Sequence, residues 1–185
     1  MKRWTWILAL LLTLAGCGFD NPELDRAMKL RTDMLASNCE FQAKVTADYG
    51  DVIQTFSMAC HSDTAGELTF TVTEPESIGG ITGTVSEEGG RLTFDDQALA
   101  FELLADGQLS PVSGPWVLMK TLRGGYVTAC GMEDGRLRLA VEDSYEDDAL
   151  RLDIWLDEND LPLRGEILWD GRRVLTVEVE GFEYL

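Results

Sequence analysis

The sequence predicts one domain that is mainly β with two helices, and two kinds of observation support this fold class. Apolar and polar residues alternate over most of the chain after residue 38. Turn-forming residues recur about every eight to twelve positions, as in antiparallel sheets, sandwiches and open barrels. Two segments carry helix-start residues instead, one at Pro22 and one just before Trp116. The length of 185 residues is enough for a sizeable core.

The N-terminal residues are arranged as a secretory signal. Lys2 and Arg3 precede the apolar run Trp4–Leu12, which is followed by Leu14-Ala15-Gly16-Cys17. A charged start, an apolar run and small residues at a cleavage site are typical of a signal peptide. The run is too short for a bilayer span of about 20 residues. The last four residues resemble the lipobox of bacterial lipoproteins.

This resemblance implies cleavage between Gly16 and Cys17 and a lipid on the Cys17 thiol. We therefore expect a signal peptide at 1–16, a lipidated tether at 17–21 and a single domain at 22–185. Buried acyl chains contribute about 0.8 kcal/mol per methylene, so such an anchor would hold the domain at the extracytoplasmic side of the cell membrane. The alternative is an ordinary signal peptide with a cysteine there by chance.

The charge of the chain limits its partners. There are 33 acidic and 15 basic residues, which gives a net charge of −18. Such an acidic domain is a poor ligand for nucleic acid and would not lie flat on anionic lipid. The acidity can also serve solubility alone.

The first predicted helix begins at Pro22, with Asn21 or Asp20 as its N-cap, and ends at Ser37-Asn38. One helical stripe is largely apolar, and this stripe is expected to pack on the sheet. Its members are Leu24, Ala27, Met28, Met34 and Leu35.

A hairpin is predicted directly after this helix. Apolar residues alternate from Cys39 to Ala47 and again from Val52 to Cys60, around a turn at Tyr49-Gly50. If the turn is centred there, opposed residues have numbers that sum to 99, and Cys39 lies opposite Cys60. The register predicts a Cys39–Cys60 disulfide, which an exported protein can form and which would contribute about 3 kcal/mol. The alternative is two reduced, buried cysteines.

The other strands follow the same alternation, with glycine pairs and acidic turns between them. Gly89-Gly90 is expected to be a turn. The expected strands cover residues 68–73, 81–85, 92–94, 99–103, 126–132, 136–142, 151–157, 163–169 and 175–180. Cys130, in an apolar strand, is expected to be a buried free thiol.

The second predicted helix interrupts this pattern. Pro111 and Pro115 mark its start, and Gly124-Gly125 end it. The apolar residues Trp116, Leu118, Met119 and Leu122 then have two interpretations. They either form a plug in the core, or a lid at the mouth of an apolar cavity.

The stretch Leu152–Ile167, followed by Asp170-Gly171, carries a further resemblance. A strand ends in the acidic turn Asp157–Asp160, and Leu161-Pro162 opens the next strand. This arrangement resembles the lipoprotein-localisation (LolA/LolB-like) family, and the chain is also similar to GerS-type envelope and spore lipoproteins of Gram-positive anaerobes. The resemblance implies an antiparallel open half-barrel of about eleven strands with helices on its concave side. In carriers of this family the cavity holds acyl chains, and in germination relatives the fold binds a protein partner.

No residue pattern indicates catalysis, a metal or a cofactor. His61 is the only histidine and lacks an evident triad partner, so a solvent-facing loop position is expected. The acidic loops at 143–148 and 157–160 lack the spacing of a calcium-binding loop. We therefore expect a non-enzymatic envelope lipoprotein that binds a lipid or acyl chain in an apolar concavity. The alternative is a structural or partner-binding lipoprotein with a filled core.

Overall fold

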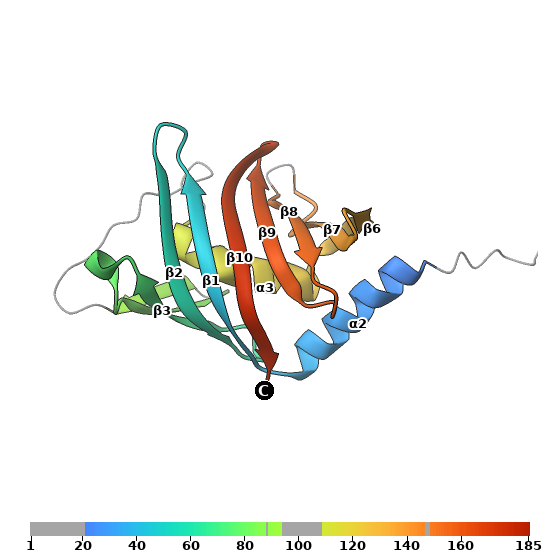
Figure 1. Cartoon of the computed structure of the whole chain (residues 1–185), viewed down its shortest axis with the longest axis horizontal. Helices are drawn as coiled ribbons and strands as arrows, with labels where there is room; N and C mark the ends of the chain where they lie inside the picture. Colours follow the sequence, from blue (N-terminus) through green and yellow to red (C-terminus); the bar gives the residue numbers. More distant parts are fainter. Residues whose placement is uncertain (1–20, 88, 94–108, 147–148) are drawn as a thin grey trace, which may run out of the picture.

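The computed structural model describes residues 21–87, 89–93, 109–146 and 149–185. Its main feature is one antiparallel sheet of ten strands in the order β5-β4-β3-β2-β1-β10-β9-β8-β7-β6. The sheet is not closed, because β5 and β6 each have one neighbour (Figure 1). The mainly β, open antiparallel architecture is thus confirmed. The expected strand at 99–103, which would make the count about eleven, lies outside the described residues.

The strands form two meanders, β1–β5 and β6–β10, which are joined by the pairing of β1 with β10; α2 precedes the first meander and α3 lies between the two in the chain. The helices are α2 (Pro22–Ala36) and α3 (Gly114–Gly124), with 3-10 turns η1 (Glu76–Ile78) and η3 (Pro111–Ser113). The strands are β1 (Cys39–Asp48), β2 (Ile53–Ser62), β3 (Leu68–Glu74), β4 (Thr82–Ser86), β5 (Gly89–Thr93), β6 (Tyr126–Glu133), β7 (Arg136–Glu142), β8 (Arg151–Leu156), β9 (Pro162–Trp169) and β10 (Arg172–Tyr184).

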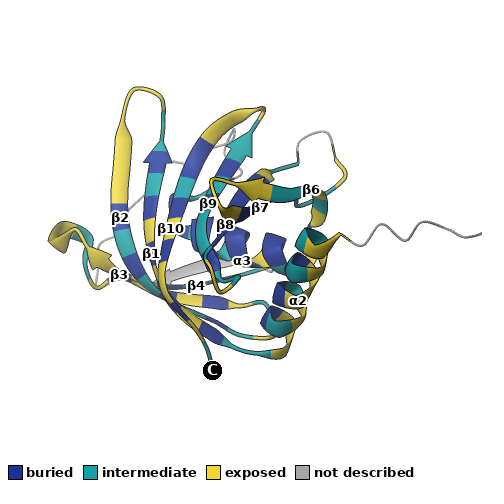
Figure 2. Cartoon of the chain, turned by 45° about the vertical axis from the view of Figure 1, so that its right-hand side comes forward, coloured by how far each residue is buried: buried dark blue, intermediate teal, exposed yellow. Residues whose placement is uncertain are grey.

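The sheet curls around α3, which lies across its concave side (Figure 2). Alternate residues of the central strands are buried, as in the sequence Phe41, Ala43, Val45 of β1. Because side chains of a strand point alternately to the two faces, one face of the sheet is covered and the other is solvated. The buried faces of the strands and of both helices form one apolar core.

Helix α2 begins where the sequence predicts. The Asn21 side chain accepts a hydrogen bond from Leu24 N at 3.0 Å, and Pro22 occupies the first turn. The buried face is Ala27, Leu30 and Met34, whereas Met28 and Leu35 of the predicted stripe are exposed. The buried face differs from the predicted one because α2 packs on α3 and β6 rather than on the whole sheet. Among the residues described, neither helix is long and apolar enough to cross a membrane.

The predicted register of the β1–β2 hairpin is wrong by two residues. A four-residue loop, Tyr49–Val52, joins Asp48 to Ile53, so Cys39 lies opposite Ser62 and Cys60 opposite Phe41. A shift of two residues keeps every side chain on its own face, so both registers match the apolar pattern equally well.

The predicted Cys39–Cys60 disulfide is not formed, and both cysteines are buried free thiols. In this register they are diagonal neighbours and do not face each other directly. Burial raises the pKa of the Cys39 thiol to about 11 and raises the pKa of Cys60 further, which keeps both groups protonated and unreactive.

The turn expected at Gly89-Gly90 is also displaced. Ser86 pairs with Gly89, so the turn lies between these residues and the glycine pair begins β5.

Candidate binding site at helix α3

Helix α3 holds the four residues that the sequence singled out, and local signals set its ends. The 3-10 turn η3 leads into it, and Pro115 lies in its first turn. At the other end Gly125 N donates to Thr121 O, and Gly125 continues in an extended conformation. A proline near the start and a glycine after the end are the usual limits of a helix.

The structure divides the four predicted residues into two groups. Leu118, Met119 and Leu122 have exposed fractions of 0 to 1% and belong to the main core. Trp116 is half-buried and lies on the solvent side of the helix. The burial of Leu118, Met119 and Leu122 is what the plug interpretation expects.

The fit between α3 and the sheet is close at two glycines. A Cβ placed on Gly165 of β9 would lie 2.7 Å from Leu118 Cδ1. A Cβ placed on Gly114, the first residue of α3, would lie 3.3 Å from a Val177 methyl group of β10. A side chain at Gly165 would have to displace the end of Leu118, and one at Gly114 would have to shift the Val177 methyl group by a few tenths of an ångström. The helix therefore fills the concave side and does not stand above it.

Beside α3 there is a groove of about 500 Å³ on the solvent side. Trp116 Nε1 donates to Gly66 O at 2.9 Å, and Lys120 Nζ lies 5.1 Å from the Trp116 ring centroid. The groove is lined by Leu35, Thr64, Ala65, Gly66, Glu87, Trp116, Lys120, Thr121, Arg123, Gly124, Gly125 and Asp143. A second hollow of about 260 Å³ shares Trp116, Lys120, Thr121 and Asp143 with it. Trp116 thus lines both hollows.

Two arginines beside the groove hold the helices together. Arg123 donates to Asp63 O at 2.6 Å and to Met34 O at 3.2 Å, which joins α3 to the β2–β3 loop and to α2. Arg31 of α2 donates to Gly125 O at 2.6 Å. Burial lowers the Arg31 pKa. The acceptors are all backbone carbonyls, so both arginines position the groove wall.

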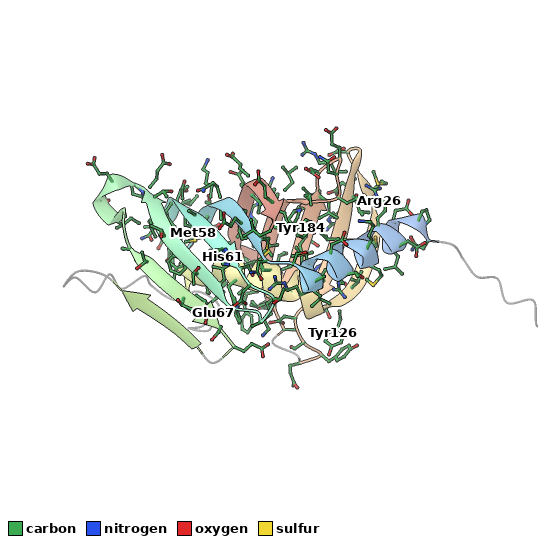
Figure 3. The ribbon with its side chains drawn as sticks, turned by 90° about the horizontal axis from the view of Figure 1, so that it is seen from below. Arg26, Met58, His61, Glu67, Tyr126 and Tyr184 are labelled. Atoms are coloured by element: carbon green, nitrogen blue, oxygen red, sulfur yellow. The ribbon has the colours of Figure 1, made fainter. Side chains whose placement is uncertain are left out.

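A separate polar groove of about 670 Å³ lies on the outer face around His61. His61 is in β2, near its end, rather than in a loop as expected (Figure 3). Its Nδ1 lies 3.2 Å from Glu40 Oε1, and both side chains are exposed. No serine hydroxyl or cysteine thiol of the described residues is hydrogen-bonded to the imidazole, and an exposed histidine–carboxylate pair alone carries no catalysis.

Histidine, cysteine and acidic side chains are the usual protein ligands of metal ions. Within the described part of the chain, no group of three or more histidine, cysteine or acidic residues is placed to hold a metal ion. Cys130 of β6 is half-buried rather than fully buried, and burial raises the pKa of its thiol. Gly16 and Cys17, the predicted cleavage and lipidation residues, lie outside the described residues.

Sequence reasoning missed two residues of the α3 surroundings. Gly165 carries the close approach to Leu118, and an isolated glycine within a strand is the available signal for such an approach. Arg123 joins three segments through backbone carbonyls, and no sequence pattern predicts those acceptors.

No family model and no curated protein sequence matches the chain. An uncharacterized conserved protein from Thermus thermophilus is 14% identical, with 89% of this chain and 86% of that one covered, at a TM-score of 0.44. A LolA superfamily protein from Nitrosomonas europaea is 10% identical, with 85% and 92% covered, at 0.43. The Pseudomonas aeruginosa MucA/MucB complex contains a chain that is 10% identical, with 89% and 57% covered, at 0.40.

The second of these structures bears the superfamily name that the Leu152–Ile167 motif resembles. At TM-scores of 0.44 or less, the three likenesses establish neither the fold nor the function of this chain. Its open-sheet architecture rests on its own strand order.

Proposed function

We propose that this chain is a non-enzymatic, lipid-anchored envelope lipoprotein that acts by binding another envelope protein through the surface of a filled domain. The observation that supports a filled domain is the burial of Leu118, Met119 and Leu122 against the concave side of the sheet. The anchor in this proposal is the lipid on Cys17, at the extracytoplasmic side of the cell membrane.

An acyl chain inside the sheet would need the space that α3 occupies. Leu118 already meets the backbone of Gly165, and Met119 and Leu122 have exposed fractions of at most 1%. Interiors are packed as tightly as organic crystals, so a ligand enters only if these side chains leave. Loss of one large buried side chain from a core costs about 2–5 kcal/mol, and an entering acyl chain would have to offset that cost for each residue it displaced.

One observation favours a lipid-binding function, namely the groove of about 500 Å³ beside Trp116. Its wall includes the exposed Leu35 and the half-buried Trp116, with Lys120 at the ring. An amphiphile could lay a short apolar segment along these residues. This site lies outside the sheet, unlike the concavity that the sequence suggested.

Native mass spectrometry of the segment Gly18–Leu185, isolated gently from a lipid-containing host, separates the two functions. We expect a bare protein, because Leu118, Met119 and Leu122 occupy the concave side of the sheet. An adduct of fatty-acid or phospholipid mass that leaves on denaturation would contradict the proposal. Trp116→Ala would then show whether the adduct occupies the groove, with Trp169→Ala, a half-buried tryptophan of β9 that does not line it, as the matched control.

The anchor has its own test. We expect the full chain to fractionate with membranes and to incorporate labelled palmitate, and Cys17→Ala to abolish the label, because the thiol is the acceptor. Cys130→Ala is the control, since that cysteine lies in β6 of the folded domain. Label that persists in Cys17→Ala would exclude Cys17 as the lipidated residue.

A further inference from the structure

Four arginines and one tryptophan lie together on the outer face of the sheet, away from α3. They alternate along their strands with buried residues such as Leu139, Leu152 and Ile167. We call this group the arginine–tryptophan patch, and its members are Arg138, Arg151, Trp155, Arg164 and Arg173.

Trp155 is the centre of the patch. It is the cross-strand neighbour of Arg138 on β7 and of Arg164 on β9. The guanidinium carbons of these arginines lie 5.5 and 5.6 Å from the ring centroid. Its Nε1 donates to Glu133 Oε2 at 2.5 Å, which fixes the ring further. Stacked guanidinium groups of this kind are held in place before any partner arrives.

The first carboxylate of the patch lies beneath two of its arginines. Asp153 Oδ2 is 2.9 Å from Arg138 Nη2, and Asp153 Oδ1 is 3.3 Å from Arg151 Nη2. The Asp153 side chain is only 10% exposed, whereas those of Arg138 and Arg151 are 31% and 49% exposed. The negative charge is therefore covered and the positive charges face solvent.

The second carboxylate repeats this arrangement on the next strands. Glu166 pairs with Arg164, and its Oε1 is 3.0 Å from Arg173 Nη1. Glu166 is 16% exposed, against 42% and 52% for the two arginines. Each half of the patch thus presents two guanidinium groups above one carboxylate.

The resulting surface departs from the charge of the rest of the chain. The protein has a net charge of −18, yet four arginines meet two covered carboxylates here. Three further acids lie at the margin: Glu133, which bonds Trp155, Glu142 opposite Arg151, and Glu178 opposite Arg164. Farther along β10 and on β1 the outer face carries Glu40, Glu178 and Glu180 with Lys44 as their neighbour. The arginines of the patch thus lie over β7, β8, β9 and the start of β10.

We propose that the arginine–tryptophan patch docks an acidic segment of a partner protein, which rests on the partner-binding function proposed above. Tryptophan and arginine are the residues that most often dominate binding at protein interfaces. A short segment meets only the patch, and at physiological salt the remaining acidic surface is screened beyond about 8 Å. An anionic bilayer, in contrast, would meet the whole acidic surface of the domain, and the like charges would repel each other.

The test uses the full chain in neutral detergent and a fluorescein-labelled peptide of alternating glutamate and threonine. Fluorescence anisotropy should show tighter binding than for the matching lysine–threonine peptide. The double variant Arg138→Gln/Arg164→Gln should weaken binding by at least about tenfold, as expected for two interface arginines. The control Lys29→Gln/Lys44→Gln removes the same charge from two exposed lysines outside the patch, and binding should stay within about twofold.

Equal binding of both peptides, or an equal loss in the control variant, would overturn the proposal. Vesicles of phosphatidylglycerol and phosphatidylcholine in equal parts test whether the patch binds a membrane instead. Binding to vesicles that depends on the patch, without peptide binding, would assign the surface to the membrane instead. If the first variant fails to fold, Arg151→Gln/Arg173→Gln removes the two more exposed arginines and must lower peptide binding similarly. A lipid adduct in native mass spectrometry would contradict the proposed function, whereas failure of the peptide alone contradicts only this surface.

Discussion

Met119→Ala is expected to lower the free energy of unfolding by about 2–5 kcal/mol, the usual cost of truncating a buried methionine. Met119 has an exposed fraction of 1% and lies within the core between α3 and the sheet. Alanine is the best helix former, so the loss would come from packing rather than from helix propensity. Urea unfolding followed by circular dichroism would measure the change.

The matched control is Lys120→Ala, the next residue of the same helix. Its side chain is exposed and makes a long 3.8 Å ion pair with Glu87 and a 5.1 Å contact with the Trp116 ring, so we expect a loss of at most about 1 kcal/mol. If both variants were equally stable, α3 would be a lid that rests on the sheet without filling it.

Gly125→Ala is expected to destabilise the fold by about 1–3 kcal/mol, the range for forced overpacking. A Cβ at this position would lie 2.7 Å from Glu142 O and 2.8 Å from Thr121 O. Both are backbone atoms, so neither can move without shifting β7 or the end of α3. Thermal unfolding of purified protein would show the loss.

The neighbouring glycine provides the control for this experiment. A Cβ added at Gly124, the last helical residue, would meet no described atom within 4 Å. Gly124→Ala should therefore be neutral or stabilise by up to about 1 kcal/mol, because alanine restricts the unfolded chain. Equal losses at both positions would show that the crowding at Gly125 does not decide the fit.

Local signals in the sequence were enough to predict most of the elements. The Asn21 cap and Pro22 locate α2, and Pro115 and Gly125 limit α3. The alternation of apolar and polar residues along β1, from Cys39 to Ala47, matches its covered face. These features depend on neighbours along the chain, so sequence suffices for them.

Features that depend on loop length or on contacts between distant segments could not be predicted. Two hairpin registers that differ by two residues bury the same face, and only the four-residue loop chooses between them. The choice between plug and lid depends on Gly165, which is in β9 and far from α3 in sequence. The arginine–tryptophan patch needed β7, β8 and β9 to be adjacent in the observed register.

The order of α2 and β1 determines how a mechanical load would enter the domain. Only Ser37 and Asn38 separate the helix from β1, which lies between β2 and β10 in the middle of the sheet. Leu185 N donates to Asn38 O at 2.9 Å, so the end of the chain is fastened at the same place. A pull on the N-terminal end would first separate α2 from α3 and β6, and would then reach a strand that two hydrogen-bonded ladders hold, instead of an edge strand held by one.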